Sequence, residues 1–143
     1  MKAIIIYNTA TGNTRAIANK MKEILEKNNH ECYIYRDKDI KNDVKTNPQF
    51  FDSYALICLG SCTHGAQPAI SFKSFINNIK SYDLRGKYLA CFSSSGGPGI
   101  WNVTCNTIKS NFPDMNHIGN FGCSLRNYDS TIKSFEEQVK AFD

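Results

Sequence analysis

Hydrophobic residues along this chain alternate between short continuous runs and longer stretches with helical spacing. The runs are rich in β-branched and aromatic residues, a pattern typical of strands buried on both faces. Five strands are predicted, at Ala3–Tyr7, Cys32–Tyr35, Ala55–Leu59, Tyr88–Phe92 and, with weaker composition, Met115–Cys123. The third of these is expected to stop at Gly60 because glycine interrupts the apolar run there.

Amphipathic helices are predicted between and after the strands, where apolar residues recur every three or four positions. Their apolar positions are Ile17, Met21, Ile24 and Leu25; Phe72, Phe75, Ile76 and Ile79; Trp101, Cys105, Ile108 and Phe112; and Ile132, Phe135, Val139 and Phe142. The charged stretch Arg36–Phe51 contains Pro48 and predicts only a short or irregular helix. The last helix is expected to begin at a cap formed by Asp129 or Ser130.

Strands that alternate with helices predict an α/β domain with a parallel sheet and helices on both faces. The length of 143 residues fits a single domain, residues 1–143. In such a sheet ligands bind outside the carboxyl ends of the strands, where the strand order reverses. The loops after the first, third and fourth strands are therefore the candidate site.

The loop after the first strand reads Asn8-Thr9-Ala10-Thr11-Gly12-Asn13-Thr14 and leads into a helix. Hydroxyl groups, an amide and free backbone N–H groups at a helix N-terminus suit a phosphate group. Gly12 allows unusual backbone dihedrals close to an anion. The loop contains no lysine and matches neither G-x-x-x-x-G-K-[ST] nor G-x-G-x-x-G, so we prefer a different phosphate site.

These residues carry a resemblance to a known family. Thr9-Ala10-Thr11-Gly12-Asn13-Thr14 resembles the phosphate-binding signature of flavodoxins, and the chain length suits their short-chain branch. The resemblance implies a three-layer α/β sandwich with a five-stranded parallel sheet in the order 2-1-3-4-5. It also implies FMN as a non-covalent cofactor and redox partner proteins, a reductase as donor and an oxidoreductase as acceptor.

Two further segments are similar to the flavin-binding loops of that family. After the third strand, Ser61, Cys62, Thr63, His64 and Gly65 match the second loop, and after the fourth, Ser93, Ser94, Gly96, Gly97 and Trp101 match the third by position. The resemblance implies that His64 covers one face of the flavin ring and that a peptide beside Gly65 flips to bond the one-electron-reduced flavin. An exposed histidine that does not contact the flavin is the alternative for His64. Trp101 is the second candidate to stack on the flavin ring, and a position in the hydrophobic core is its alternative.

Composition narrows the class of protein. The chain has 17 Lys and Arg, 13 Asp and Glu, and a formal net charge of +4, an excess too small and too dispersed to favour nucleic-acid binding. Its apolar runs are too short for a membrane span, so a cytoplasmic protein with reduced cysteines is expected. Both ring-binding segments lack carboxylates, unlike those of acidic flavodoxins, which predicts easier formation of the anionic fully reduced flavin.

Three functions are compared on these residues. The leading hypothesis is a low-potential carrier of single electrons without catalytic residues, in which FMN supplies the chemistry. The alternative is an FMN-dependent oxidoreductase acting on a quinone or another small substrate, favoured by the small uncharged segment Ser93–Gly99. A response regulator would need aspartates after the first and third strands, where this chain has none.

Overall fold

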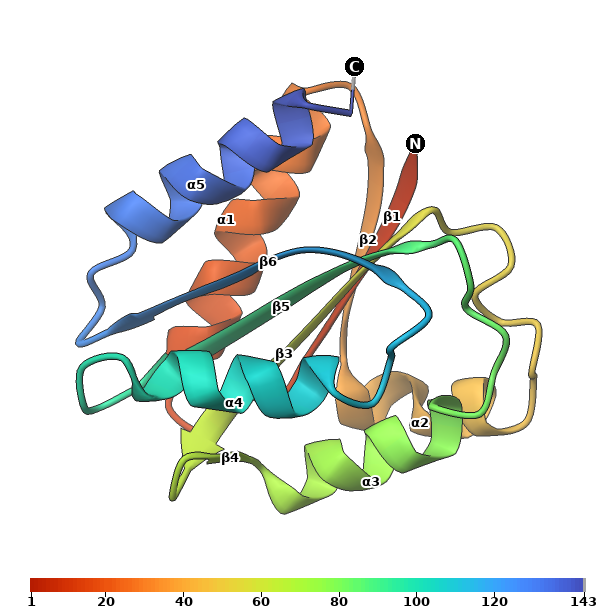
Figure 1. The fold of residues 1–143 in the computed structure, drawn as a ribbon, viewed down its shortest axis with the longest axis horizontal. Helices are drawn as coiled ribbons and strands as arrows, with labels where there is room; N and C mark the ends of the chain where they lie inside the picture. Colours follow the sequence, from red (N-terminus) through yellow and green to blue (C-terminus); the bar gives the residue numbers. More distant parts are fainter. Residues whose placement is uncertain (143) are drawn as a thin grey trace.

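The computed structural model describes residues 1–142 and has a central sheet flanked by helices (Figure 1). The strands are β1 (Lys2–Tyr7), β2 (Glu31–Arg36), β3 (Leu56–His64), β4 (Gln67–Pro68), β5 (Tyr88–Ser95) and β6 (Asn116–Ser124). The helices are α1 (Asn13–Lys27), α2 (Asp37–Lys45), α3 (Ile70–Ile79), α4 (Ile100–Lys109) and α5 (Asp129–Lys140).

The order of strands in the sheet is β2-β1-β3-β5-β6, and all four neighbouring pairs on this path are parallel. The five long strands therefore follow the predicted order, and the α/β fold class is confirmed. The predicted number of strands was wrong by one. A sixth strand, the two-residue β4, pairs antiparallel with the end of β3, and a segment this short has no hydrophobic pattern to reveal it.

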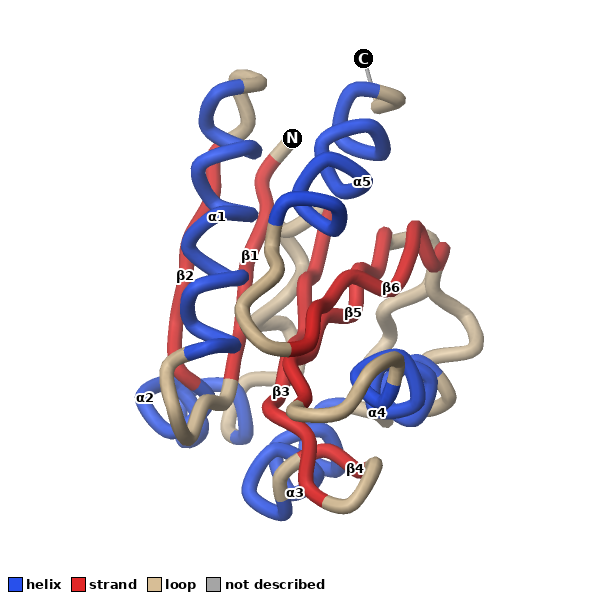
Figure 2. The backbone as a smooth tube through the Cα atoms, turned by 90° about the vertical axis from the view of Figure 1, so that its left-hand side faces the viewer, coloured by secondary structure: helices blue, strands red, loops and turns tan. Residues whose placement is uncertain are grey.

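Helices cover both faces of the sheet, with α1 and α5 on one side and α2, α3 and α4 on the other (Figure 2). Successive side chains of a strand point to opposite faces. In β1, Ile4 and Ile6 enter the core under α2, α3 and α4, whereas Ala3 and Ile5 enter the core under α1 and α5. Both faces are buried, which explains the continuous apolar runs in the sequence.

Several element ends differ from the sequence-based expectation. β3 continues past Gly60 to His64, and β5 continues to Ser95, because the polar residues there still pair in register, Ser61 with Ser93 and Cys62 with Ser94. α2 is a regular nine-residue helix because its buried Ile40 and Val44 anchor it. The predicted cap of α5 was wrong, since the N-cap residue is Tyr128 and no side-chain cap bond forms.

Candidate flavin-binding site

The loop between β1 and α1 is shaped by a short hydrogen bond. The Gly12 N–H donates to Thr9 Oγ1 at 2.9 Å, and Gly12 adopts a left-handed φ of 91°. This turn places the N-terminus of α1 at the carboxyl end of β1, and the first turn of α1 contains no acidic residue. The first backbone N–H groups of a helix have no helical acceptor and lie at the positive end of its dipole. The loop therefore offers an anion site.

Asn8 anchors this loop to its surroundings. Its Nδ2 donates to Asp37 Oδ2 at 3.1 Å and to Ser71 Oγ at 2.9 Å, and its carbonyl accepts the Cys62 N–H at 3.3 Å. Arg36 Nη2 donates to the Thr9 carbonyl at 3.3 Å from the end of β2. No separate role for Asn8 was predicted from the sequence. Its contacts join the first segment of the site, Thr9–Thr14, to the second, Ser61–Gly65.

A buried hydroxyl pair joins the first and third segments. Thr14 Oγ1 and Ser94 Oγ lie 2.8 Å apart, and both side chains are buried. Because Thr14 belongs to the first turn of α1 and Ser94 to the end of β5, this contact fixes the helix N-terminus against the sheet. The sequence contains both hydroxyls, but only the fold shows that residues 80 positions apart meet.

A chain of hydroxyls joins the second and third segments. Ser93 Oγ donates to the Ser61 carbonyl at 2.6 Å and lies 2.9 Å from Thr63 Oγ1. Thr63 Oγ1 is also 2.9 Å from Thr104 Oγ1 of α4. Since Ser93 has one hydroxyl proton and gives it to the carbonyl, Thr63 donates to Ser93 and Thr104 donates to Thr63. The three segments are thus held together before any ligand binds.

A cavity of about 310 Å³ opens where these segments meet. Ligand pockets commonly have volumes of roughly 300–1000 Å³. Its lining residues are Ala10, Thr11, Asn13, Cys62, Thr63, His64, Ser94, Ser95, Gly96 and Leu125. Eight of these ten belong to the residues predicted from the sequence, so the fold brings all three predicted segments to one hollow.

Other predicted residues lie around the cavity rather than on its wall. Thr9, Thr14, Ser61 and Ser93 are buried and hold the segments through hydrogen bonds. Gly12 forms the turn before α1, and Gly97 accepts a bond from Ser95 Oγ at 2.7 Å. Ser95 also lines the cavity and lies within the predicted third segment, whereas Leu125 lines it and was not predicted. Leu125 is recognisable only as a single apolar residue in a polar loop.

Gly65 lies at the tip of a tight hairpin. Gly65 and Ala66 have φ values of 55° and 62° and connect β3 to β4, with His64 opposite Gln67. Positive φ at both central residues is what a type I′ turn requires. A Cβ at Gly65 would meet no atom within 4 Å, so backbone conformation rather than space favours glycine there. This hairpin carries His64 to the edge of the cavity.

Trp101 lies next to the site but packs inward. Its indole lies against Gly122 of β6, where a Cβ would be only 2.4 Å from the ring, and it packs against the core on the α4 side. Within the described residues 1–142, Trp101 is not among those that line the cavity. His64, in contrast, is exposed at the cavity edge, with Nε2 3.2 Å from Cys62 Sγ.

Within residues 1–142, no Asp, Glu, Lys or Arg lines the cavity. Burial raises the pKa of the Cys62 thiol above its usual value, and hydrogen bonds oppose this only in part. The thiol is therefore neutral near pH 7.

No group of three or more His, Cys, Asp or Glu residues that could hold a metal occurs within residues 1–142. Hydroxyls, amides and a helix N-terminus match the phosphate and polar edge of a flavin mononucleotide, so the donor set fits FMN.

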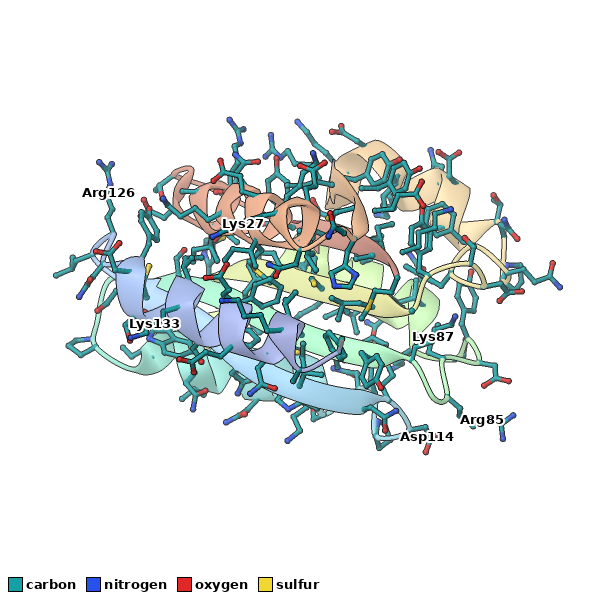
Figure 3. The ribbon with its side chains drawn as sticks, turned by 90° about the horizontal axis from the view of Figure 1, so that it is seen from above. Lys27, Arg85, Lys87, Asp114, Arg126 and Lys133 are labelled. Atoms are coloured by element: carbon teal, nitrogen blue, oxygen red, sulfur yellow. The ribbon has the colours of Figure 1, made fainter. Side chains whose placement is uncertain are left out.

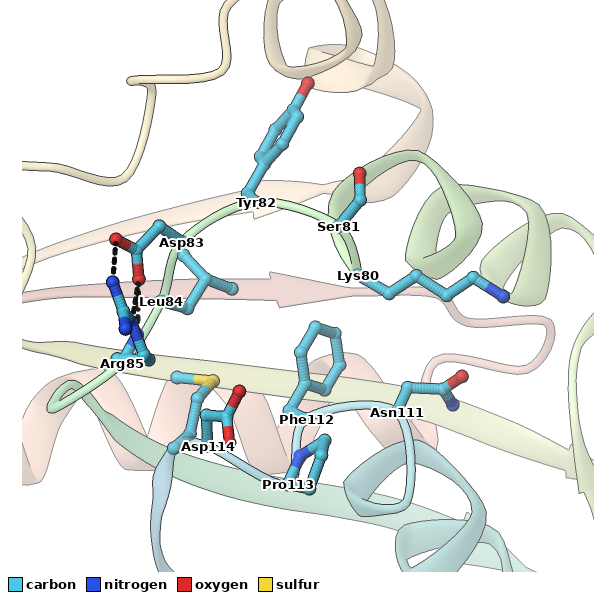
Figure 4. A pocket seen from close by; sticks show the side chains of 11 residues that line it. Lys80, Ser81, Tyr82, Asp83, Leu84, Arg85, Asn111, Phe112, Pro113 and Asp114 are labelled. Atoms are coloured by element: carbon cyan, nitrogen blue, oxygen red, sulfur yellow. Dashed lines mark hydrogen bonds and ion pairs between the residues drawn. The ribbon is translucent and has the colours of Figure 1, made fainter.

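A larger cavity, of about 410 Å³, lies at the opposite end of the sheet (Figure 4). It is lined by the segments that precede β5 and β6, including Tyr82 and Phe112. At its rim Arg85 Nε and Nη2 donate to the two carboxylate oxygens of Asp83 at 2.9 and 3.1 Å. The charges of Asp83 and Arg85 thus neutralise each other, and none of the predicted site residues lines this cavity.

Comparison with known proteins places the chain in a family. A family model described as "Flavodoxin domain" matches residues 4–115. The chain therefore belongs to the flavodoxin family, whose members bind a flavin, usually FMN, and transport electrons.

Solved structures share the fold. A short-chain flavodoxin associated with a non-canonical PDU bacterial microcompartment is 18% identical over 98% of this chain and 95% of its own, with a TM-score of 0.81. Flavodoxin 2 from Bacillus cereus is 20% identical over 99% and 97%, with a TM-score of 0.78.

One similar structure belongs to a much longer protein. The rubredoxin oxygen:oxidoreductase of Desulfovibrio gigas is 12% identical over 97% of this chain, with a TM-score of 0.80. This chain spans only 34% of the length of that protein. At these identities the likeness establishes the fold.

Proposed function

We propose that this protein is an FMN-binding, low-potential electron carrier that passes single electrons between redox partner proteins, a reductase and an oxidoreductase. One observation carries the proposal. Three segments at the carboxyl ends of the strands are hydrogen-bonded to one another and surround one cavity with hydroxyl and amide groups beside the α1 N-terminus. FMN would supply the redox chemistry when bound.

Each segment has a separate part in holding the cofactor. Thr11, Gly12 and Asn13, with the first N–H groups of α1, would bind the phosphate. The segments around Thr63 and Ser94 would contact the ring system, with His64 and Leu125 at the exposed edge.

The lack of carboxylates on the cavity wall sets an expectation for the redox potential. A negative charge near the flavin opposes formation of its anionic, fully reduced state. Since no acidic side chain lines this cavity, we expect the second reduction step to occur at a less negative potential than in acidic flavodoxins. A spectroelectrochemical titration that gives an equally low potential would contradict this expectation.

The thiols are consistent with a reducing compartment. All six cysteines are buried and unpaired, and no helix in residues 1–142 is long and apolar enough to cross a membrane. Free buried thiols persist in the cytoplasm, where disulfides are rare. We therefore place the proposed carrier in the cytoplasm.

The first experiment is the visible spectrum of the purified protein before and after incubation with FMN and removal of the excess. The proposal expects a retained flavin spectrum and a one-electron-reduced form on anaerobic half-reduction. Retained flavin without that form, together with steady turnover of a quinone, would favour an FMN-dependent oxidoreductase. A protein that retains no flavin would contradict both functions.

A further inference from the structure

The large hydrophobic side chains that are exposed cluster at one end of the molecule. In the described part of the chain these are Ile70, Ile100, Val103 and Leu125, with 85%, 38%, 48% and 79% of their surfaces exposed. Ile70 begins α3 just after the hairpin at His64, Ile100 and Val103 lie in the first turn of α4, and Leu125 lines the candidate flavin cavity. Exposed apolar side chains grouped around a cavity mark an interaction surface.

The loop that carries Leu125 is held in an unusual conformation. Leu125 and Arg126 have φ values of 53° and 65°, which residues other than glycine rarely adopt. This backbone exposes both side chains beside the cavity, and neither makes a side-chain hydrogen bond or ion pair within residues 1–142. Such outliers concentrate at binding and switch regions, so the loop supports the same interaction surface.

Charged residues are distributed unequally between the two ends. Asp83 is the only acidic residue between Asp52 and Asp114, and both Asp83 and Asp114 line the cavity at the far end. Figure 3 shows Arg126 at one end of the molecule, with Arg85 and Asp114 at the other. The third residue of α1, Arg15, is a second exposed cation near the flavin cavity.

Few carboxylates lie near the flavin cavity to balance the positive charges of Arg15 and Arg126. Asp129 begins α5, Asp39 lies in the first turn of α2, and both are exposed. Asp37 is buried and already accepts hydrogen bonds from Asn8 Nδ2 and the Lys38 N–H. Beside it, Arg36, Lys38 and Lys41 line a separate hollow of about 250 Å³ next to the first loop. The charged groups around this end are therefore predominantly cationic.

We propose that the surface formed by Ile70, Ile100, Val103, Leu125 and Arg126 is the docking face for an acidic redox protein that carries carboxylates around its own redox centre. This inference rests on the proposed function, because Leu125 lines the flavin cavity and the other four residues lie where α3 and α4 begin and where β6 ends, at the same end of the sheet. Apolar contacts exclude water near the centre, and the cations orient the acidic partner during encounter. A second copy of this chain does not fit, since it would oppose cation to cation.

The charge of the face is tested with the FMN-loaded, photoreduced protein and two inorganic oxidants. Each oxidant removes one electron per event: ferricyanide, an anion, becomes ferrocyanide, and hexaamminecobalt(III), a cation, becomes cobalt(II). Stopped-flow rates are measured from about 10 mM to about 300 mM salt, over which charge screening strengthens several-fold. We expect the ferricyanide rate to fall with added salt and the hexaamminecobalt(III) rate to rise.

Variants locate the charge on the molecule. Arg126→Glu should slow oxidation by ferricyanide roughly threefold or more at low salt, and Arg126→Gln should have a smaller effect. Lys80→Glu, which makes the same charge change beside the far cavity, should leave the rate unchanged. Equal responses to Lys80→Glu and Arg126→Glu, or rates independent of salt, would overturn the docking face while leaving FMN binding intact.

The apolar part of the face is tested with a protein oxidant. A rubredoxin serves as a small acidic acceptor, and Ile70→Ser should slow its reduction several-fold without changing the ferricyanide rate. Faster reduction of a basic c-type cytochrome than of the rubredoxin at low salt would overturn the proposal. A protein that retains no FMN would contradict the proposed function itself, and its spectrum would show this before any oxidant is mixed.

Discussion

Two cavities lie at opposite ends of the central sheet. They differ less in volume than in whether their polar groups already have hydrogen-bond or ion-pair partners. The cavity beside β5 and β6 at their amino ends is the larger, about 410 Å³ against about 310 Å³. Its Asp83 and Arg85 bind each other, and this ion pair holds the pKa of the Asp83 carboxyl below its usual value. The smaller cavity is bordered by the N-terminus of α1, whose first N–H groups have no helical acceptor. Available donors, rather than volume, distinguish the candidate site.

The strongest test of this difference places one new carboxylate in each cavity. Thr11→Asp would put a negative charge beside the phosphate position, and Ser81→Asp would put the same charge in the far cavity. At an effective dielectric constant of 20 and a separation of about 5 Å, the repulsion is about 3 kcal/mol, or roughly a hundredfold in affinity. Fluorescence titration with FMN measures both dissociation constants. Comparable losses in the two variants would show that the first loop does not hold the phosphate.

The hairpin at Gly65 offers a paired test of backbone strain. Gly65→Val places a β-branched residue at a φ of 55° and should lower the free energy of unfolding by about 2 kcal/mol. Ala66→Gly relieves the same kind of strain at a φ of 62° and should raise it by up to about 1 kcal/mol. Urea unfolding of the apoprotein gives both values.

The same two variants separate stability from redox behaviour. We expect Gly65→Val to reduce the amount of one-electron-reduced flavin formed during anaerobic titration, because the neighbouring peptide would lose its freedom to flip. Ala66→Gly should preserve that amount. An undiminished one-electron-reduced form in Gly65→Val would exclude the peptide flip from the proposed function.

A smaller effect is expected from the buried contact between the first and third segments. Replacing Thr14 by Val, or Ser94 by Ala, removes one partner of a 2.8 Å hydroxyl pair and should lower the free energy of unfolding by about 1–2 kcal/mol in each case. The double variant should lose less than the sum, with a coupling energy of about 1 kcal/mol. Strictly additive losses from chemical denaturation would mean that the two hydroxyls do not interact in solution.

The smallest expected effect belongs to His117, near the amino end of β6. Burial lowers the pKa of His117, although its hydrogen bond to Asn120 Oδ1 at 2.9 Å opposes this shift. A lowered pKa means that the unfolded chain takes up the proton first, so stability should fall slightly as the pH decreases below about 6.5. His117→Gln should flatten the dependence of the urea midpoint on pH between 7.5 and 5. A midpoint that rises on acidification would contradict the assigned direction.

The five long strands and the first loop were predictable because each depends on local signals, whereas the order of the strands was implied by the family resemblance. The apolar run of β1 and the polar run from Thr9 to Thr14 are continuous in the sequence. The ends of β3 and β5 were not predictable, because their polar residues are stabilised as strands by pairing with each other. Leu125 was missed because its exposure depends on a loop conformation that has no local sequence signal.

The packing of Trp101 against Gly122 has a practical consequence. Trp101 is the only tryptophan in the chain, and its backbone N–H donates to Ser95 Oγ of the third segment at 3.2 Å. Indole emission overlaps flavin absorption, so a flavin in the adjacent cavity would quench this residue by energy transfer. One tryptophan thus gives a label-free optical signal whose intensity reports the fraction of molecules that carry cofactor. Dissociation kinetics of every variant could be followed from that single emission band.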